Sequence, residues 1–512
     1  MVKKEEKDWF KLKRYPHIGL PLNPNDRLKW IEPYVTSNDE VAKHAFLPFI
    51  HRTARVKKFR KKYNTTTGKI EFILVDGKKT VRNPNEKKRE LFYASHLDSL
   101  IFSYYAYQLN KKYETKLSDF DLKDVVNAYR SIPVNPSDKD SSNKCNIDFT
   151  NDVFKYILGY NQKEFSVIAF DISSFFDNLD HKLLRDVWCD LLKVKKLPDD
   201  HFNVYKNITR FSHVDIVDIF KEFKDRIHTQ KTNKVGVKLK IKRKKIDKIK
   251  FLRDHDAIAF CTEKEFLKVK NKLLQPSKTK IVNKKVIYRN FGIPQGSPIS
   301  SVLANMYLLH FDKLINDFVT NIGGIYRRYS DDMIVVCPLN QKSKLIDIVY
   351  SEIKNYKLEI QPSKTQIFRF EYKVDKLQCG EEYMNGETIN WHKNFIYLGF
   401  EFDGQTVLLK SASLSGYYRK MKRGVRRAKY YSKKTKKEIF KRRLFKRHSY
   451  IGAKRTRKYI WNEEKKKFLK SEYYNWGNFL SYAFKAAHIM INNKIKQQTK
   501  RHWKILNREL KK

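Results

Sequence analysis

The stretch "YRRYSDDMIVV", Tyr326 to Val336, decides how the rest of the chain is interpreted. The runs on either side of Ser-Asp-Asp are rich in β-branched and aromatic residues, and they predict two short strands joined by a tight turn. Aspartate is common in turns, so Asp331 and Asp332 alone predict no more than a solvated turn. The alternative is a metal site, because adjacent carboxylates repel one another and a cation relieves that repulsion.

A third aspartate favours the metal site. "FSVIAFDISSFFDNLD" opens as a buried strand and then reaches Asp171, where an isolated charge would be costly. If the two strands are neighbours, Asp171 and Asp331 face each other across a narrow gap. Hard carboxylate oxygens suit Mg²⁺, which proteins hold with one or two carboxylates plus substrate phosphates. Two such ions can activate a 3′-hydroxyl and stabilise a leaving pyrophosphate, so the chemistry implied is nucleotidyl transfer.

The charge of the chain points to nucleic acid. Its 512 residues include 108 Lys+Arg and 56 Asp+Glu, a net charge of 108 − 56 = +52. Phosphate backbones are the best partner for such charge, because binding releases condensed counterions. A membrane surface is the second choice, weakened because no apolar run is long enough to span a bilayer. Hydrophobic residues make up 41% of the chain, enough for a sizeable core.

The expected compartment is the cytoplasm. The N-terminal "MVKKEEKDWF" lacks the apolar stretch of a signal peptide. The five cysteines form no CxxC pair, so neither a zinc ribbon nor a disulfide framework is expected.

Several further elements are predicted along the chain. "KIEFILVDGKKTV" is typical of a hairpin with an Asp76–Gly77 turn, and residues 95–117 carry apolar side chains at helical spacing. Residues 411–512 hold 33 Lys+Arg against 5 Glu and no Asp, a charge of 33 − 5 = +28. This last segment is expected to be helical. Because aromatics lie among its cations, it is interpreted as a nucleic-acid surface rather than a solvated face.

Five motifs follow one another along the chain: "AFDISSFFDNLDH", "GIPQGSPISSVLANMYL", "YRRYSDDMIVV", "LEIQPSKTQIF" and "FIYLGFEF". They come in the order of consecutive palm motifs of reverse transcriptases, and the chain resembles that family over about residues 80–404. The resemblance implies an α+β, right-hand polymerase fold with fingers, a palm built on an antiparallel sheet and a helical thumb. The expected divisions are an N-terminal extension with fingers (1–165), a palm (166–404) with a lysine-rich, fingers-type insertion at about 190–290, and a basic helical thumb (405–512).

The resemblance also implies roles for the acidic residues. Asp171 and Asp331 match the principal ligands of two Mg²⁺ ions, for which Mn²⁺ could substitute, and Asp332 matches the supporting acid. The backbone carbonyl of Ile172 is expected to reach the metal. Lys364, in "SKT", matches the lysine near the leaving pyrophosphate and is a candidate general acid.

A second set of residues is expected to bind the incoming nucleotide. Phe176, five residues after Asp171, falls where the family keeps its steric gate against a 2′-hydroxyl; a core phenylalanine is the alternative interpretation. Gln295 and Gly296, in "PQG", resemble the loop that contacts the nucleotide. Arg89 is the first choice and Arg130 the second for a guanidinium on the triphosphate.

Within the family, "YASHLDSLIFSYYAYQLNKKYE", "NAYRSI" and the lysine-rich insertion look most like the bacterial defence-associated reverse transcriptases, the unknown-group and abortive-infection enzymes. That resemblance implies antiphage defence, with a cognate structured non-coding RNA, deoxynucleotides and a DNA product as partners, and an oligomeric assembly in some relatives.

Three alternatives stay open at this point. One is template-independent or protein-primed synthesis by the same fold. The second is a viral-type RNA-dependent RNA polymerase, against which Phe176 argues because such enzymes usually place an acid at that position. The third is a non-catalytic RNA-binding scaffold, against which the intact Asp171, Asp331 and Asp332 argue.

Overall fold

The computed structural model forms the predicted hairpin: β14 (Ile325–Tyr329) and β15 (Asp332–Pro338) pair antiparallel on either side of Ser330 and Asp331. The structure describes residues 9–63, 70–75, 78–80, 82–138, 141–232, 238–276, 280–282, 285–383, 389–462, 467–475 and 477–512.

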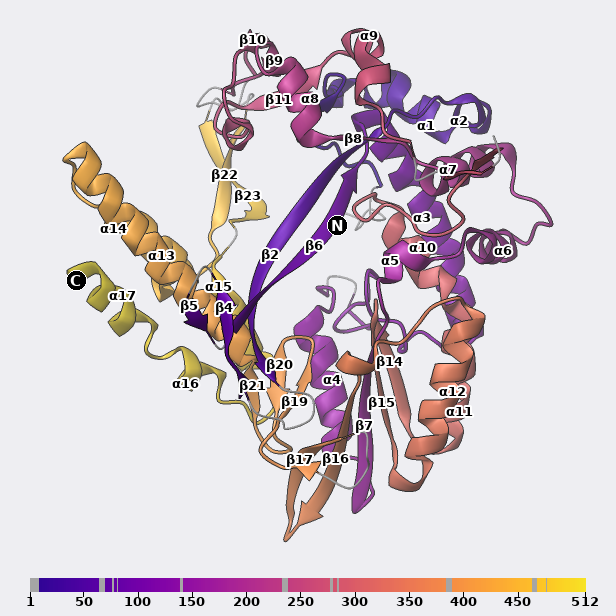
Figure 1. Ribbon diagram of the computed structural model, residues 1–512, viewed down its shortest axis with the longest axis vertical. Coiled ribbons are helices and arrows are strands. Elements are labelled where there is room, and N and C mark those ends of the chain that lie inside the picture. Colours follow the sequence, from indigo (N-terminus) through magenta and orange to yellow (C-terminus); the bar gives the residue numbers. More distant parts are fainter. Residues whose placement is uncertain are drawn as a thin grey trace. The chain divides into compact units, whose positions relative to one another are not determined.

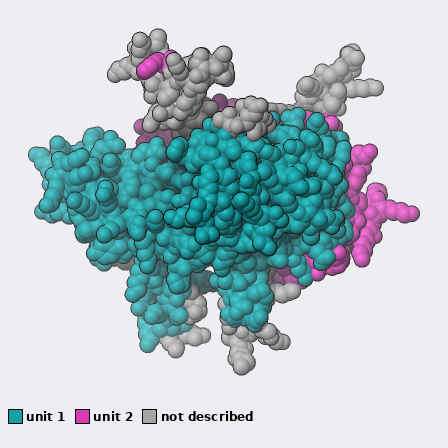
Figure 2. Space-filling model, turned by 90° about the horizontal axis from the view of Figure 1, so that it is seen from below, with its two compact units in different colours: residues 1–4, 120–173, 309–512 teal, residues 5–119, 174–308 magenta. Residues whose placement is uncertain are grey.

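The described residues divide into two units, each made of segments that are distant in sequence (Figure 2). Unit 1 combines residues 120–173 and 309–512, and unit 2 combines residues 9–119 and 174–308. The division into fingers, palm and thumb at residues 165 and 404 does not coincide with these units and stays a prediction.

Unit 1 is built around a six-stranded antiparallel sheet in the order β14-β15-β7-β16-β17-β18. The central strand β7 (Glu164–Asp171) is the buried strand predicted before Asp171, and its continuous run of buried residues from Phe165 to Ile168 suits a sheet covered on both faces. The other strands are β16 (Gln366–Lys373), β17 (Lys376–Glu382) and β18 (Ile389–Asn390).

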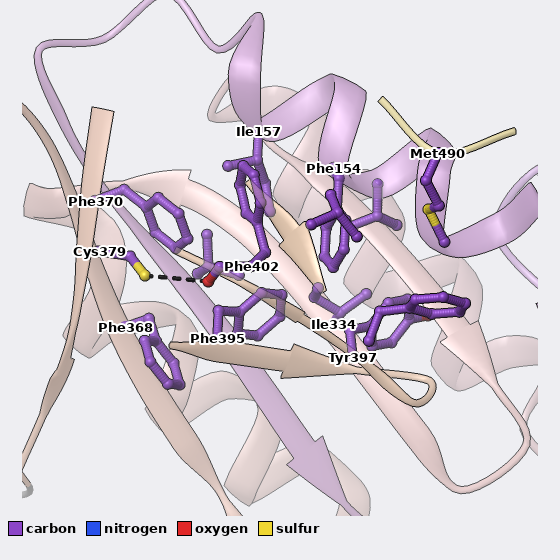
Figure 3. Packing of buried hydrophobic residues seen from close by; sticks show 14 of the residues in the cluster. Phe154, Ile157, Ile334, Phe368, Phe370, Cys379, Phe395, Tyr397, Phe402 and Met490 are labelled. Carbon is purple, nitrogen blue, oxygen red and sulfur yellow. Dashed lines mark hydrogen bonds between the residues drawn. The ribbon is translucent and has the colours of Figure 1, made fainter. Parts of the chain in front are cut away.

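Helices cover both faces of this sheet. Figure 1 shows α4 (Asn146–Leu158) on one side and α11 (Leu309–Asn321) with α12 (Lys342–Asn355) on the other. On the α4 side, Phe154 stacks on Phe402 with ring centroids 4.8 Å apart, and the Cys379 thiol donates to the Phe402 carbonyl at 3.4 Å (Figure 3). On the other side, the rings of Phe170 and Tyr350 meet edge to face at 6.3 Å. The strand end that carries Asp171 therefore rests on a packed sheet.

A small sheet and a basic helical region complete unit 1. The sheet consists of β19 (Phe395–Tyr397), β20 (Phe400–Phe402) and β21 (Val407–Leu409). The helices are α13 (Ser411–Thr435), α14 (Lys441–His448), α15 (Phe479–Ile489), α16 (Ile495–Thr499) and α17 (His502–Lys511). Tyr417, Met421 and Val425, spaced four residues apart on α13, form the apolar stripe of their shared core.

The expectation that residues 411–512 are helical throughout is wrong for one segment. β22 (Arg457–Asn462) and β23 (Lys467–Tyr474) form an antiparallel hairpin. Tyr459, Ile460, Phe468 and Tyr473 are β-favouring residues, so β-propensity prevails over the lysine-rich composition.

Within the described residues, unit 2 contains two four-stranded sheets, two two-stranded sheets and a buried helix. The long ribbon of β2 (Phe49–Tyr63) and β6 (Arg82–Tyr93) also pairs with β8 (His213–Asp215). A second sheet has the order β1-β11-β9-β10. The helix expected at residues 95–117 is confirmed as α3 (His96–Asp119), whose apolar side chains are buried at helical spacing.

The remaining elements of unit 2 are short. They are β1 (His17–Ile18), α1 (Glu32–Thr36), α2 (Asn38–Lys43), β3 (Ile70–Glu71), β4 (Ile73–Val75), β5 (Lys78–Thr80), α5 (Phe175–Asn178), α6 (His181–Leu192), α7 (Asp199–Thr209), α8 (Ile216–Phe223), β9 (Ile227–Thr229), β10 (Lys242–Lys244), β11 (Ala257–Cys261), α9 (Glu263–Leu273), β12 (Lys280–Val282), β13 (Lys285–Ile287) and α10 (Ser300–Tyr307). The predicted hairpin at residues 69–81 is confirmed by the pairing of β4 with β5, while its Asp76–Gly77 turn lies outside the described residues.

Two histidines are buried in unit 2 without charge partners. His96 is 4% exposed, its ring stacks on Tyr15 at 5.7 Å, and neither of its ring nitrogens has a hydrogen-bond partner within the described chain. Burial lowers the pKa of His96 to about 4 and that of His17 to about 3. Both rings are therefore neutral in the folded unit at neutral pH.

We expect unit 2 to lose stability as the pH falls from 6.5, the ordinary histidine value, towards about 4. In that window the unfolded chain binds protons that the folded chain cannot, so the loss from His96 is about 3 kcal/mol at most. Urea unfolding as a function of pH measures it. His96→Phe should reduce the dependence of the unfolding free energy on pH, whereas the exposed control His255→Phe should leave it unchanged. Equal slopes in the unsubstituted protein and both variants would show that His96 is not the source of the pH dependence.

Among the residues that the structure describes, no helix is both long and apolar enough to cross a membrane.

Candidate active site

The three aspartates come together at one end of the unit 1 sheet. β7 and β15 are neighbours, as predicted, but their register sets Asp171 opposite Asp332 rather than opposite Asp331, because Asp331 lies in the turn before β15. Asp331 lies in the turn, where its carbonyl accepts a hydrogen bond of 3.2 Å from the amide of Ile172. Ser330 takes a positive φ of 63°, which lets a two-residue turn follow the twist of the strands. The turn therefore holds the acids against the end of β7.

The loop before β16 fixes the other side of the site. The amide of Gln361 donates to the carbonyl of Asp171 at 2.8 Å, and that of Ser173 donates to Glu359 at 2.8 Å. These bonds bring Lys364 over the strand end, and its Nζ lies 2.5 Å from Asp171 Oδ1. The sequence predicted a lysine near the reacting phosphates; in the structure its charge is paired with the first aspartate. The side chain of Ser363 lies outside the described residues.

A cavity of about 410 Å³ opens over these residues within unit 1. Asp171, Asp332 and Lys364 line it together with Tyr397 and Lys410. Tyr397 belongs to the "YLGF" turn that resembles a primer grip. Lys410 was not singled out in the sequence, because one lysine among 108 basic residues carries no signal without its position in space.

The negatively charged carboxylates at this cavity repel one another. The pKa of Asp332 is raised to about 6: partial removal of water is the largest cause and the negative charges of Asp331 and Asp171 add to it, while Lys364 and Lys410 lower the pKa. The side chain of Asp332 is nevertheless solvent-exposed, so bulk water screens part of this repulsion. A site with these properties gains from a bound cation.

The donor set fits Mg²⁺. Two facing carboxylates with a third beside them offer the hard oxygen ligands that Mg²⁺ prefers, and the charges of Asp331 and Asp171 contribute, after burial, to the raised pKa of Asp332. No closed cluster of three or more acidic, histidine or cysteine side chains forms within the described ranges. An open site is the expected arrangement for an ion whose remaining ligands are water and substrate phosphates.

A buried ion pair supports the Asp-Asp turn, and sequence reasoning missed it. Arg328 and Asp312 are both 0% exposed; Arg328 Nε donates to Asp312 Oδ1 at 2.7 Å and Nη2 donates to Oδ2 at 2.5 Å. Arg328 Nη1 also donates to the carbonyl of Ser330 at 3.2 Å. Burial raises the pKa of Asp312, and Arg328 and Tyr326 oppose that rise. The alternation of side chains along a strand could have predicted this pair, because it places Arg328 on the same buried face of β14 as Tyr326.

The loop before α4 packs beside the same turn. The Tyr129 hydroxyl lies 3.2 Å from that of Ser330. Arg130, the second choice for a triphosphate ligand, donates through Nη1 to the carbonyls of Lys123 and Val126, both at 2.6 Å. Its guanidinium is thus engaged with backbone in unit 1, and its role in nucleotide binding stays a prediction.

The predicted nucleotide-binding residues of unit 2 lie around the "PQG" loop. The amide of Phe92, at the end of β6, donates to the carbonyl of Gln295 at 2.9 Å, and the amide of Ile293 donates to Phe176 at 2.9 Å. A Cβ on Gly296, whose φ is 120°, would lie 2.6 Å from the Phe92 carbonyl, so only glycine allows this approach. The loop is therefore fixed between α5 and β6.

Phe176 was interpreted either as a steric gate or as a core phenylalanine, and its exposure differs from that of its neighbour Phe175. Phe175 is 3% exposed and packs in the core, whereas Phe176 is only half-buried. Arg89 is exposed on β6, opposite Ala54 of β2. Unit 2 thus presents Phe176, Gln295 and Gly296 on one loop system, with Arg89 on the strand that holds that loop.

The family comparison agrees with this geometry. Residues 190–402 match the family model described as "Reverse transcriptase (RNA-dependent DNA polymerase)". This region of the chain is therefore similar to a reverse transcriptase domain. The match includes Gln295, Asp331, Asp332 and Lys364 and begins after Asp171. The predicted α+β, right-hand polymerase fold is confirmed.

Among solved structures, similar chains include yeast telomerases. A telomerase from Candida tropicalis truncated from its C-terminal domain is 13% identical, with 68% of this chain and 55% of that chain covered and a TM-score of 0.32. A telomerase from Candida albicans, in complex with a TWJ fragment of telomeric RNA, is 12% identical, with 81% and 58% covered and a TM-score of 0.32. The chain thus spans little more than half the length of these proteins. A comparison with curated proteins finds no match.

Proposed function

We propose that the protein is an RNA-directed DNA polymerase that adds deoxynucleotides to a 3′-hydroxyl at the Asp171–Asp332 site. The observation that carries the proposal is the register of β7 and β15, which sets two carboxylates opposite each other at the rim of a cavity shared with Lys364. The reverse transcriptase domain supplies the reaction class. The test is metal-dependent incorporation of deoxynucleotides on an RNA template by the purified chain.

In this mechanism, Asp171, Asp331 and Asp332 would hold Mg²⁺, with the Ile172 carbonyl as a candidate further ligand. The bound ions would activate the 3′-hydroxyl and stabilise the charge that develops on the phosphates. Lys364, whose Nζ lies beside Asp171, would hold a proton near the leaving pyrophosphate. The Tyr397–Gly399 turn and Lys410 border the same cavity and position the primer end.

Phe176→Ala is expected to admit ribonucleotides. The half-buried ring at this position would exclude a 2′-hydroxyl, so removing it should lower the discrimination between deoxynucleotides and ribonucleotides by roughly 100-fold. Parallel incorporation assays with each nucleotide class measure the ratio. Phe175→Ala is the matched control: its buried ring supports the core, so stability should fall while sugar discrimination stays. Unchanged discrimination in Phe176→Ala would reject the gate.

The partners we propose are a cognate structured RNA, deoxynucleoside triphosphates and a DNA product. The basic surface of residues 411–512 supports an RNA partner, and its hairpin exposes 65% of Tyr459 and 69% of Tyr473 among lysines and arginines. A role in antiphage defence in the bacterial cytoplasm completes the proposal; its support is the sequence pattern shared with defence-associated enzymes. Sequencing the RNA and DNA that co-purify with the protein from its native locus tests both parts.

A further inference from the structure

A two-residue turn borders the cavity that Asp171 and Asp332 line. Leu398 and Gly399 join β19 to β20, and both line the cavity. The backbone takes a positive φ at each of them, 41° at Leu398 and 97° at Gly399. Such angles suit a tight turn between two strands, but they are unfavourable for a leucine, which carries a Cβ. The turn therefore needs contacts that hold Leu398 in this conformation.

One such contact comes from the first residue of α4, 252 positions earlier in the chain. Asn146 Nδ2 donates to the carbonyl of Leu398 at 3.1 Å and to the hydroxyl of Tyr482 at 2.9 Å. Because a carbonyl can only accept, the Leu398 contact also fixes which end of the side-chain amide faces the turn. Asn146 thus uses both of its amide hydrogens to join the turn at the cavity to α15, which carries Tyr482.

A second hydrogen bond holds the other residue of the turn. The amide of Lys410, the residue before α13, donates to the carbonyl of Gly399 at 3.0 Å. The side chain of Leu398 packs against the core of unit 1. At Gly399, by contrast, no atom of the described chain beyond its two neighbours lies within 4 Å of the place that a Cβ would take. Hydrogen bonds to the backbone, rather than packing, therefore hold the tip of the turn.

We propose that Asn146 is a positioning residue for the polymerase reaction, and that its side-chain amide holds the Leu398–Gly399 turn at the edge of the candidate active site. This inference rests on the polymerase function proposed above, in which that turn positions the primer end. A 3′-hydroxyl reacts only within a narrow range of distance and direction, so a shift of about 1 Å would cost about 100-fold in rate. Asn146 precedes residues 190–402, the region that matches the family model.

Asn146→Asp tests the proposal while keeping the start of α4. The substitution preserves the shape of the side chain, and an acid in the first turn of a helix is favourable, so the free energy of unfolding in urea should change little. It removes the donation to the Leu398 carbonyl, because a carboxylate offers only acceptors. The amide of Lys410 should then exchange with deuterium about tenfold faster or more, since its bond to Gly399 opens with the turn. Mass spectrometry with fragmentation to single amides measures this exchange in the full-length protein, without metal or nucleotide.

The same variant should show a defect in rate rather than in nucleotide binding. At saturating template and primer, its maximal rate of incorporation should fall about tenfold or more, while the KM for deoxynucleotides changes less than about twofold. The split is expected because the predicted nucleotide contacts Phe176 and Gln295 belong to unit 2. Asn143→Asp is the matched control, which introduces the same charge at an exposed position that does not line the cavity. It should change neither the exchange of Lys410 nor the rate.

Leu398→Gly provides a rescue. Glycine adopts a positive φ without steric cost, so the turn should keep its conformation without the Asn146 bond. Asn146→Asp/Leu398→Gly should therefore exchange more slowly at Lys410, and incorporate faster, than Asn146→Asp alone.

Three results would overturn the proposal: unchanged exchange at Lys410 in Asn146→Asp, equally faster exchange throughout unit 1, or no recovery in the double variant. If the unsubstituted protein incorporates no deoxynucleotide, the polymerase proposal fails. The exchange measurements still decide in that case whether Asn146 holds the turn, because they need neither metal nor product.

Discussion

Replacing Asp331 and Asp332 together by alanine is expected to abolish deoxynucleotide incorporation, lowering its rate on the order of a thousandfold or more. Their carboxylates would hold the ions that stabilise the charge developing on the phosphates, a contribution of several kcal/mol, and each 1.36 kcal/mol changes a rate tenfold. RNA affinity should be retained, since it depends on the cations and aromatics outside the Asp-Asp turn. Incorporation by the purified variant, measured beside a filter-binding assay on the same RNA, checks both statements.

The exposed Asp347 of α12 provides the control, because Asp347→Ala removes a carboxylate of the same unit that does not line the cavity. That variant should incorporate deoxynucleotides at the normal rate. If the double variant instead kept the full biological activity of the protein, the non-catalytic RNA-binding scaffold would be the better description. If it lost RNA binding as well, the turn would have a structural rather than a metal-binding role.

Local sequence pattern was sufficient to predict the centre of this site. An aromatic and basic run before "SDD" and a β-branched run after it specify a hairpin, and an apolar run ending in Asp171 specifies a buried strand. The pattern did not predict which residues of the two strands lie opposite each other. Whether Asp171 faces Asp331 or Asp332 depends on a register that tertiary packing sets, and the structure pairs it with Asp332.

Contacts between residues distant in sequence explain why the Arg328–Asp312 pair and the position of Lys410 could not be predicted. Arg328 and Asp312 are 16 residues apart on a strand and a helix, and each alone is typical of a solvated surface. Lys410 is one of many lysines until the fold brings it to the cavity that Asp332 lines. The hairpin at residues 457–474 was missed for a different reason, because its β-favouring residues stand among lysines, which are good helix formers.

Arg328→Met is expected to be the most destabilising single substitution in unit 1, with a cost of about 3–5 kcal/mol. The change leaves Asp312, which is 0% exposed, as an uncompensated buried charge. It also removes the Nη1 bond to the Ser330 carbonyl, so the Asp-Asp turn loses a support and incorporation should fall with stability. Hydrogen exchange of the β14 and α11 amides measures the local free energy of opening, together with urea unfolding of the full chain.

Two further variants separate the buried charge from the lost contacts. Arg328→Met/Asp312→Leu removes both charges, and it should recover much of the stability because no unpaired group remains in the core. Lys313→Met is the matched control on α11, the helix that carries Asp312. Lys313 and Asp317 form an exposed pair at 2.5 Å, whose loss should cost no more than about 0.5 kcal/mol. Equal losses of unfolding free energy in Arg328→Met and Lys313→Met would show that the buried pair contributes no more to stability than the exposed pair. A double variant that regains stability but not incorporation would assign the pair to positioning the Asp-Asp turn, because packing alone would then hold unit 1 while the Ser330 carbonyl stays unsupported.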